Sequence, residues 1–124
     1  FVGSRGLGDV YKRQGNFIVA QYNSCKLNEG TNLRTFYDVY VDFAKMAQEK
    51  GDVQGRKLII PGAGYDGDAD FIRLVYASKV SERGEGIEFW RSELRDTDER
   101  RALVGMADCG SGSIYVGPVL RSPN

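Results

Sequence analysis

The chain has 124 residues, which suits one domain with a single hydrophobic core and leaves no room for a second domain. Its 17 Lys and Arg residues balance its 17 Asp and Glu residues, so nucleic acid is a poor candidate partner, and no apolar run approaches the roughly 20 residues that span a bilayer. The sequence has no histidine and only two cysteines, which excludes Ser-His and Cys-His catalytic pairs, a histidine-ligated haem, most catalytic zinc sites and a cysteine-rich zinc site.

Residues 1–14 (FVGSRGLGDVYKRQ) are expected to be a non-native leader. The segment DVYKRQ at residues 9–14 resembles the translation of a transposase adapter used to prepare DNA libraries. We therefore expect a metagenomic reading frame that has lost its native start, and the leader is excluded from fold reasoning. The alternative is a flexible arm, rich in glycine and cations, that touches an acidic partner. With the native start lost, localisation stays open between the cytoplasm and export to the periplasm or medium.

The first two elements follow from hydrophobic periodicity. Residues 16–26 are rich in β-branched and aromatic side chains and predict a strand. After a turn, either Thr31 or Asn32 is expected to cap a helix that Gly51 closes. Apolar residues recur along that helix at spacings of three and four: Leu33, Phe36, Tyr37, Tyr40, Phe43, Ala44 and Ala47.

The middle of the chain predicts a hairpin. Residues 57–61 form a short strand, which Pro61 places at a sheet edge or brings to its end. Residues 71–79 alternate as a third strand, and the glycine- and aspartate-rich residues 62–70 join the two.

The last third predicts helix and then strand. Residues 81–95 favour a helix that Gly84 and Gly86 weaken, each by about 1 kcal/mol relative to alanine. Residues 96–99 (DTDE) are similar to a capping box and predict a further helix through Ala107. Residues 113–120 predict the fourth strand.

The resulting order is strand, helix, strand, strand, helix, strand. It resembles the ferredoxin-like fold and, given the length and the segment YNSCKLNEG before an aromatic-rich helix, the dimeric α/β-barrel superfamily. We expect an α+β domain of βαββαβ order over residues 15–120, with a tail at residues 121–124. Its four-stranded antiparallel sheet carries both helices on one face. The two right-handed crossovers are expected to set the first and third strands side by side and parallel.

The resemblance implies a range of functions. The superfamily includes cofactor-free monooxygenases, isomerases, haem peroxidases and uncharacterised proteins, and no catalytic motif of any of them matches this sequence. The absence of histidine argues against the histidine-ligated haem branch. The resemblance also implies a homodimer that packs sheet against sheet.

The same pairing is expected from the strand pattern. We assign to the helix side Ile18, Ala20, Tyr22, Ile72, Leu74, Tyr76, Ile114 and Val116. The open side then holds Phe17, Val19, Phe71, Val75, Tyr115 and Val119. Each large apolar group left in water forfeits about 1.5–3 kcal/mol, so a second copy is expected to cover this face. The alternative cover is a segment lost with the native N-terminus.

The candidate ligand-binding residues are Gln21, Asn23, Arg73 and Tyr115, which the assigned alternation places on the open face among apolar side chains. A mainly apolar lining with a few convergent polar groups is typical of a ligand cavity. Arg73 stands in the middle of a strand, where it needs either an acidic partner or a ligand anion. We favour the acidic partner, across the dimer, or a hydrated position at the rim.

Three functions remain open. The leading hypothesis is a small-molecule-binding protein that uses no cofactor. The second is a cofactor-free monooxygenase or isomerase acting on a small aromatic or polyketide-like substrate, in which Asn23, Arg73 and Tyr115 polarise a carbonyl or an enolate. The third is a structural partner in a larger assembly. Whether the protein is an enzyme is left undecided.

The two cysteines are expected to come close together. Cys25 ends the first strand and Cys109 precedes the fourth, and these strands are antiparallel neighbours in the expected sheet. A disulfide would indicate an oxidising compartment, whereas free buried thiols would suit the cytosol. The sequence leaves both states open.

Three alternating aspartates, Asp66, Asp68 and Asp70, suggest a calcium loop. The resemblance to an EF-hand fails because Phe71 and Ala77 occupy the positions of its glycine and its bidentate glutamate. We therefore expect a solvated acidic hairpin tip and no metal.

Overall fold

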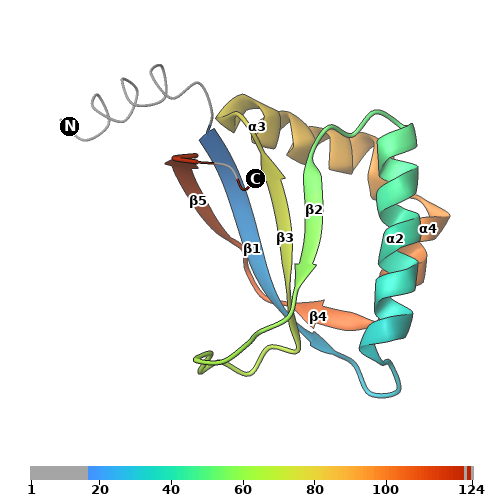
Figure 1. Cartoon of the computed structure of the whole chain (residues 1–124). Helices are drawn as coiled ribbons and strands as arrows, with labels where there is room; N and C mark the ends of the chain where they lie inside the picture. The colour runs from blue at the N-terminus through green and yellow to red at the C-terminus, as the bar shows by residue number, and fades with distance from the viewer. Residues whose placement is uncertain (1–16, 122, 124) are drawn as a thin grey trace.

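An antiparallel sheet organises the computed structural model, which describes residues 17–121 and 123 (Figure 1). The leader expected at residues 1–14 lies outside these residues. Five strands are described: β1 (Phe17–Leu27), β2 (Gly55–Ile59), β3 (Phe71–Ala77), β4 (Ala107–Cys109) and β5 (Ser113–Pro118). Their order is β2-β3-β1-β4, and β5 pairs with β1 on the same edge as β4. All four pairings are antiparallel.

The helices cover one face of this sheet (Figure 1). They are α2 (Leu33–Glu49), α3 (Val80–Phe89) with its continuation in the π-helix η1 (Trp90–Leu94), and α4 (Asp98–Leu103). The core lies between α2, η1 and the sheet, and its buried members are Cys25, Phe36, Tyr40, Phe43, Ala47, Phe71 and Leu94.

The elements follow the ferredoxin-like, α+β order that the sequence predicts. A first crossover runs from β1 through α2 to β2, a hairpin joins β2 to β3, and a second crossover runs from β3 through the helices to β4 and β5. The helix prediction for residues 33–47 is confirmed. Asn32 is its N-cap, and its side-chain oxygen accepts a hydrogen bond from the Thr35 N–H at 2.8 Å.

The expected parallel pairing of the first and third strands is wrong. The crossover through α2 makes β1 and β2 run in the same direction with one strand position left between them. The hairpin partner β3 fills that position, so it is antiparallel to β2 and to β1 alike.

The single fourth strand expected at residues 113–120 is also revised. β4 and β5 together form that edge, and a bulge separates them. Cys25 pairs with Cys109 and Tyr22 pairs with Ser113, so between these pairs two residues of β1 lie opposite three residues of the edge. The helix expected through Ala107 ends at Leu103 instead, because Gly105 turns the chain with a φ of 85° and β4 begins two residues later.

The assignment of the two sheet faces is reversed in β1 and β3. Val19, Phe71 and Val75 lie buried beneath the helices, whereas their neighbours Ile18 and Ile72 lie on the open face. Both faces of these strands are apolar, so alternation alone does not distinguish them. The packing of α2 decides the matter, because its Phe36 ring meets the Phe71 ring at a centroid distance of 4.7 Å.

Candidate cavity between the sheet and the helices

A cavity of about 450 Å³ lies between the helix side of the sheet and the helices α2, α3, η1 and α4. Its apolar wall includes Phe36, Tyr40, Phe43, Val75, Trp90 and Leu103. Its polar wall includes Gln21, Asn23, Gln54, Arg56, Arg73 and Arg83. The volume is within the roughly 300–1,000 Å³ of small-molecule sites, and the lining combines apolar and polar side chains.

One cavity arginine, Arg56, has an acidic partner. Its Nε and Nη2 donate to Asp52 Oδ2 at 3.2 and 2.9 Å, and the two side chains are 12% and 4% exposed. The Gln54 N–H donates to the other oxygen of Asp52 at 3.2 Å. The charge of Arg56 is therefore compensated inside the protein, in the hydrogen-bonded geometry that a buried ion pair requires.

A second arginine, Arg83 of α3, is held by neutral groups. Its Nη1 donates to Gln54 Oε1 at 2.7 Å, and its Nη2 donates to Gln21 Oε1. Its Nε is buried and has no hydrogen-bond partner among the described residues. Burial, followed by the charges of Arg56 and Arg73, lowers the pKa of Arg83, and Asp52 opposes this only as the weakest of the four contributions.

The third arginine is Arg73, in the middle of β3 between Asn23 of β1 and Leu58 of β2. Its Nε is buried without a hydrogen-bond partner, and it forms no ion pair with any carboxylate among the described residues. The acidic partner that we favoured for Arg73 was expected across the dimer, or Arg73 at a hydrated rim, and that expectation stays a prediction. Arg73 and Arg83 thus both line the cavity, and neither forms an ion pair with a carboxylate of the described residues.

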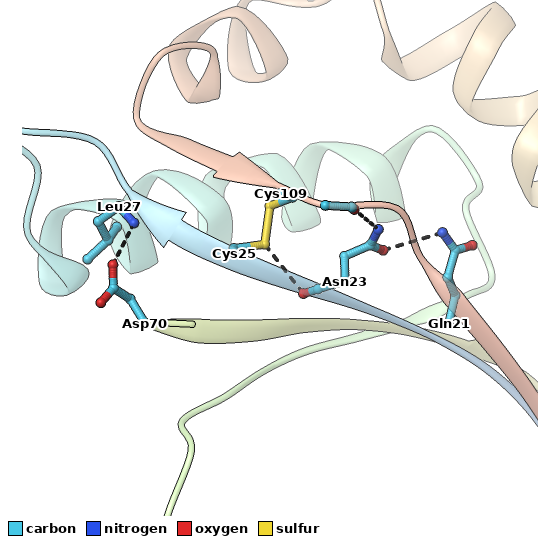
Figure 2. The surroundings of a disulfide bond; sticks show 7 residues. Gln21, Asn23, Cys25, Leu27, Asp70 and Cys109 are labelled. Atoms are coloured by element: carbon cyan, nitrogen blue, oxygen red, sulfur yellow. Dashed lines mark hydrogen bonds between the residues drawn. A yellow bond between two sulfur atoms is a disulfide. The ribbon is translucent and has the colours of Figure 1, made fainter. Parts of the chain in front are cut away.

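A chain of hydrogen bonds connects Arg83 with the edge of the sheet, and Figure 2 shows the part of it that runs from Gln21 through Asn23. Gln21, which accepts from Arg83, donates through Nε2 to Asn23 Oδ1 at 3.3 Å. Asn23, only 5% exposed, donates through Nδ2 to the Gly110 carbonyl at 2.9 Å. The bulge exposes this carbonyl to a side chain because the residues around it leave the regular ladder.

The disulfide stands beside this chain of hydrogen bonds (Figure 2). Cys25 and Cys109 are bonded across the β1-β4 pair, and Cys109 lines the cavity. The described residues include no free cysteine. The bond ties the short strand β4, and with it the bulge at Gly110, to the buried end of β1.

The structure brings together three of the four predicted ligand-binding residues. Gln21, Asn23 and Arg73 all line the cavity, although beneath the helices and not on the open face. Tyr115 lies on the opposite face, where it pairs with Ala20 and packs edge-on against Tyr22 at 5.4 Å between ring centroids. The bulge shifts β5 by one residue, which sends the Tyr115 side chain away from Arg73.

Sequence reasoning missed Gln54, Arg56 and Arg83. The sequence carries one signal for Gln54, which is Gly86 inside a predicted helix. In the structure, a Cβ added to Gly86 would lie 2.0 Å from the Gln54 side chain. A glycine in a helix interior costs stability and so indicates a close approach. The partner across that approach is far away in the sequence and only the fold identifies it.

The aspartates of the β2-β3 loop have structural roles. Asp70 accepts a hydrogen bond from the Leu27 N–H at 2.8 Å, and Asp68 forms an exposed ion pair with Lys26 at 3.4 Å. Among the described residues, no group of three His, Cys, Asp or Glu side chains is arranged to hold a metal ion.

The comparisons with known proteins give only weak likenesses. No family model and no curated protein matches the chain. Among solved structures, it is similar to a dimeric ferredoxin-like protein of unknown function from Thermobifida fusca, with TM-score 0.47, 10% identity and coverage of 83% of this chain and 92% of that one. A dimeric protein of unknown function with a ferredoxin-like fold from Bacteroides fragilis has TM-score 0.40, 11% identity and coverage of 83% and 96%. A protein of unknown function from Rhodopseudomonas palustris has TM-score 0.34, 13% identity and coverage of 92% and 94%.

At these TM-scores the likeness carries no information on function, and the fold is assigned from this chain's own strand order. In the part of the chain that the structure describes, no helix is long and apolar enough to cross a membrane.

Proposed function

We propose that this protein binds a small anionic molecule in the cavity between its sheet and its helices. The observation that carries the proposal is the pair Arg73 and Arg83, which lack a carboxylate partner among the described residues. A guanidinium removed from water without a counter-charge is costly, and a bound anion removes that cost. The planar donor fork of arginine also matches carboxylate and phosphate groups.

The rest of the cavity suits an organic body attached to that anion. Phe36 and Trp90 supply broad apolar surfaces, and Asn23 is held by Gly110 in one orientation. Rigid polar groups in an apolar wall favour one orientation of a ligand over others.

Titration calorimetry tests this proposal with benzoate and the neutral benzamide as probes. We expect benzoate to bind and benzamide to bind much more weakly, because only benzoate compensates the arginine charge. Arg73→Gln should abolish benzoate binding. Arg91→Gln is the matched control, since Arg91 is on the surface and pairs with Glu88. Equal binding of both probes, or of both variants, would contradict the proposal.

A cofactor-free enzyme is the second candidate, and Tyr40 is the observation that favours it. Its hydroxyl is buried without a hydrogen-bond partner in the described residues, and Tyr40 lines the cavity. In place of Tyr115, it could join Asn23 and Arg73 in polarising a carbonyl or enolate of an aromatic or polyketide-like substrate. Turnover that falls in Tyr40→Phe while binding persists would support this role, and unchanged turnover would oppose it.

We further propose a homodimer that packs through the open sheet face. All the described helices lie on the other face (Figure 1). In one chain the apolar side chains of Ile18, Ile59 and Tyr115 on the open face are exposed to solvent. The large apolar side chains of this face include Ile18, Tyr22, Ile59, Ile72, Tyr76 and Tyr115. A second copy covers such a face with an identical one. A monomeric partner in a larger assembly is the alternative, which the mass in solution distinguishes.

A further inference from the structure

We infer that the cavity selects a ligand head group with two negative charges. This inference rests on the proposed function and specifies the ligand class of the same site. It depends on the number of charges that the protein leaves uncompensated in the cavity wall.

The charges inside the cavity do not balance. Arg56, Arg73 and Arg83 line it, and Asp52 beside Arg56 is the one described carboxylate that pairs with any of them. Arg100 and the exposed Asp108 also line the cavity and add one charge of each sign to its wall. Two positive charges therefore remain.

The neighbouring polar groups do not reduce this excess. The carbonyl oxygens of Gln21 and Gln54 both accept from Arg83, and the remaining amide oxygen of the network, on Asn23, accepts from Gln21. These dipoles orient the Arg83 guanidinium but supply no negative charge. Their acceptor atoms are also already engaged, so a ligand meets donors in this wall.

Repulsion between the like charges makes a dianion the best complement. Arg56 and Arg73 both act on Arg83 electrostatically, so the three groups share one local field. A monoanion leaves one positive charge uncompensated at low local dielectric, whereas a dianion neutralises both. Two arginine forks also provide enough donors for the oxygens of a phosphate monoester or of two carboxylates.

The apolar wall describes the remainder of the ligand. Phe36, Val75 and Trp90 favour an aromatic or aliphatic body over a polar one. The shared chemistry is thus a dianionic head on a small apolar body, and its source is either a phosphate monoester or a dicarboxylate.

Titration calorimetry on the full chain tests this with probes that share a benzene ring. Phenyl phosphate and phthalate are dianions, and methyl phenyl phosphate and benzoate are monoanions. At about pH 8 we expect at least one dianion to bind about tenfold or more tightly than both monoanions. The tighter of the two dianions identifies the source as a phosphate ester or a dicarboxylate.

The pH dependence gives a second readout. The second pKa of a phosphate monoester is about 6, so phenyl phosphate should lose its advantage over methyl phenyl phosphate as the pH falls to about 5. Methyl phenyl phosphate is a diester that keeps one negative charge throughout this range, so it should bind with equal affinity at both pH values.

Variants of the protein complete the test. Arg83→Gln removes one of the two excess charges and should bring dianion and monoanion affinities close together, whereas Arg91→Gln should keep the wild-type ratio. Circular dichroism reports whether each variant folds, and the wild-type probe series stands whatever the variants do. Equal affinity for monoanions and dianions would overturn the inference and leave the proposed function intact. Binding of no anion at all would overturn both.

Discussion

Arg73 is placed in the sheet at a cost to stability, and that cost distinguishes a functional residue from a structural one. It occupies a central strand between Asn23 and Leu58, and it has no acidic partner among the described residues. Arg56, two strand positions away across the β2-β3 pair, has the same chemistry but a bonded carboxylate. The two arginines should therefore respond to substitution in opposite ways.

Arg73→Met should raise the free energy of unfolding of the ligand-free protein by about 1–2 kcal/mol, because it removes an unpaired charge and keeps the apolar stem. It should also abolish anion binding. Chemical denaturation and calorimetry on the same sample measure both effects.

Arg56→Met is the control. It should lower the free energy of unfolding by about 3–5 kcal/mol, since it leaves Asp52 buried and unpaired. A loss of stability in Arg73→Met as large as in Arg56→Met would indicate that Arg73 has a structural role instead.

Two glycines of α3 provide a second comparison at this scale. A Cβ at Gly84 would meet no atom within 4 Å, whereas one at Gly86 would strike the Gln54 amide that holds Arg83. Gly84→Ala should stabilise the protein by about 0.5–1 kcal/mol through helix propensity and leave binding unchanged.

Gly86→Ala has the same propensity gain but displaces Gln54 from Arg83. We expect it to give a smaller gain in melting temperature than Gly84→Ala and a weaker affinity for the anion. Thermal denaturation and calorimetry of the pair provide the measurement. Equal stabilisation and equal affinity in both variants would show that Gln54 does not position Arg83.

Among the elements, the divided edge strand connects the disulfide to the cavity. β4 has only three residues and pairs with the end of β1. The disulfide to Cys25 secures it, and the bulge that follows presents the Gly110 carbonyl to Asn23. Trp90 of the π-helix η1 also lines the cavity, and π-helical turns recur at functional sites.

Removal of the disulfide should therefore affect stability and binding together. The Cys25→Ser, Cys109→Ser double variant should lose about 2–4 kcal/mol of the free energy of unfolding, because the bond spans 84 positions of the sequence. It should also bind the anion more weakly, since Asn23 and Gln21 lose a fixed anchor. A dithiol reductant should reproduce both effects in the wild-type protein and neither in the variant. Undiminished affinity after reduction would separate the disulfide from the site.

For the whole molecule, the uncovered sheet face predicts the state of association. Tyr115 lies on that face and is 62% exposed in one chain. Val80 is similarly exposed, at 59%, but belongs to the helix α3 and not to the sheet. Sedimentation velocity should show a dimer for the wild-type protein. Tyr115→Glu should shift it toward monomer because a carboxylate would be buried in the interface.

Val80→Glu is the matched control and should sediment like the wild-type protein. A wild-type monomer at every concentration tested would exclude the homodimer and favour the assembly-partner alternative. Retention of the dimer in Tyr115→Glu would place the interface elsewhere.

The local sequence determined the elements of this protein. The spacing of Phe36, Tyr40 and Phe43 predicted α2, and its cap was predicted at Thr31 or Asn32, because helix periodicity and capping involve residues within one or two turns. The βαββαβ order followed from the same local signals, and so did the singling out of Arg73 as a charge in the middle of a strand.

Only the tertiary structure decided which sheet face the helices cover, in which register β5 pairs with β1, and which arginine has its charge compensated by a carboxylate. Both faces of β1 and β3 are apolar. One extra residue at the bulge leaves Tyr115 on the open face while Arg73 lies beneath the helices, and Asp52 forms its ion pair with Arg56 and not with Arg73. These outcomes depend on contacts between residues far apart in the chain. Periodicity describes each segment separately, and the cavity exists only where several segments meet.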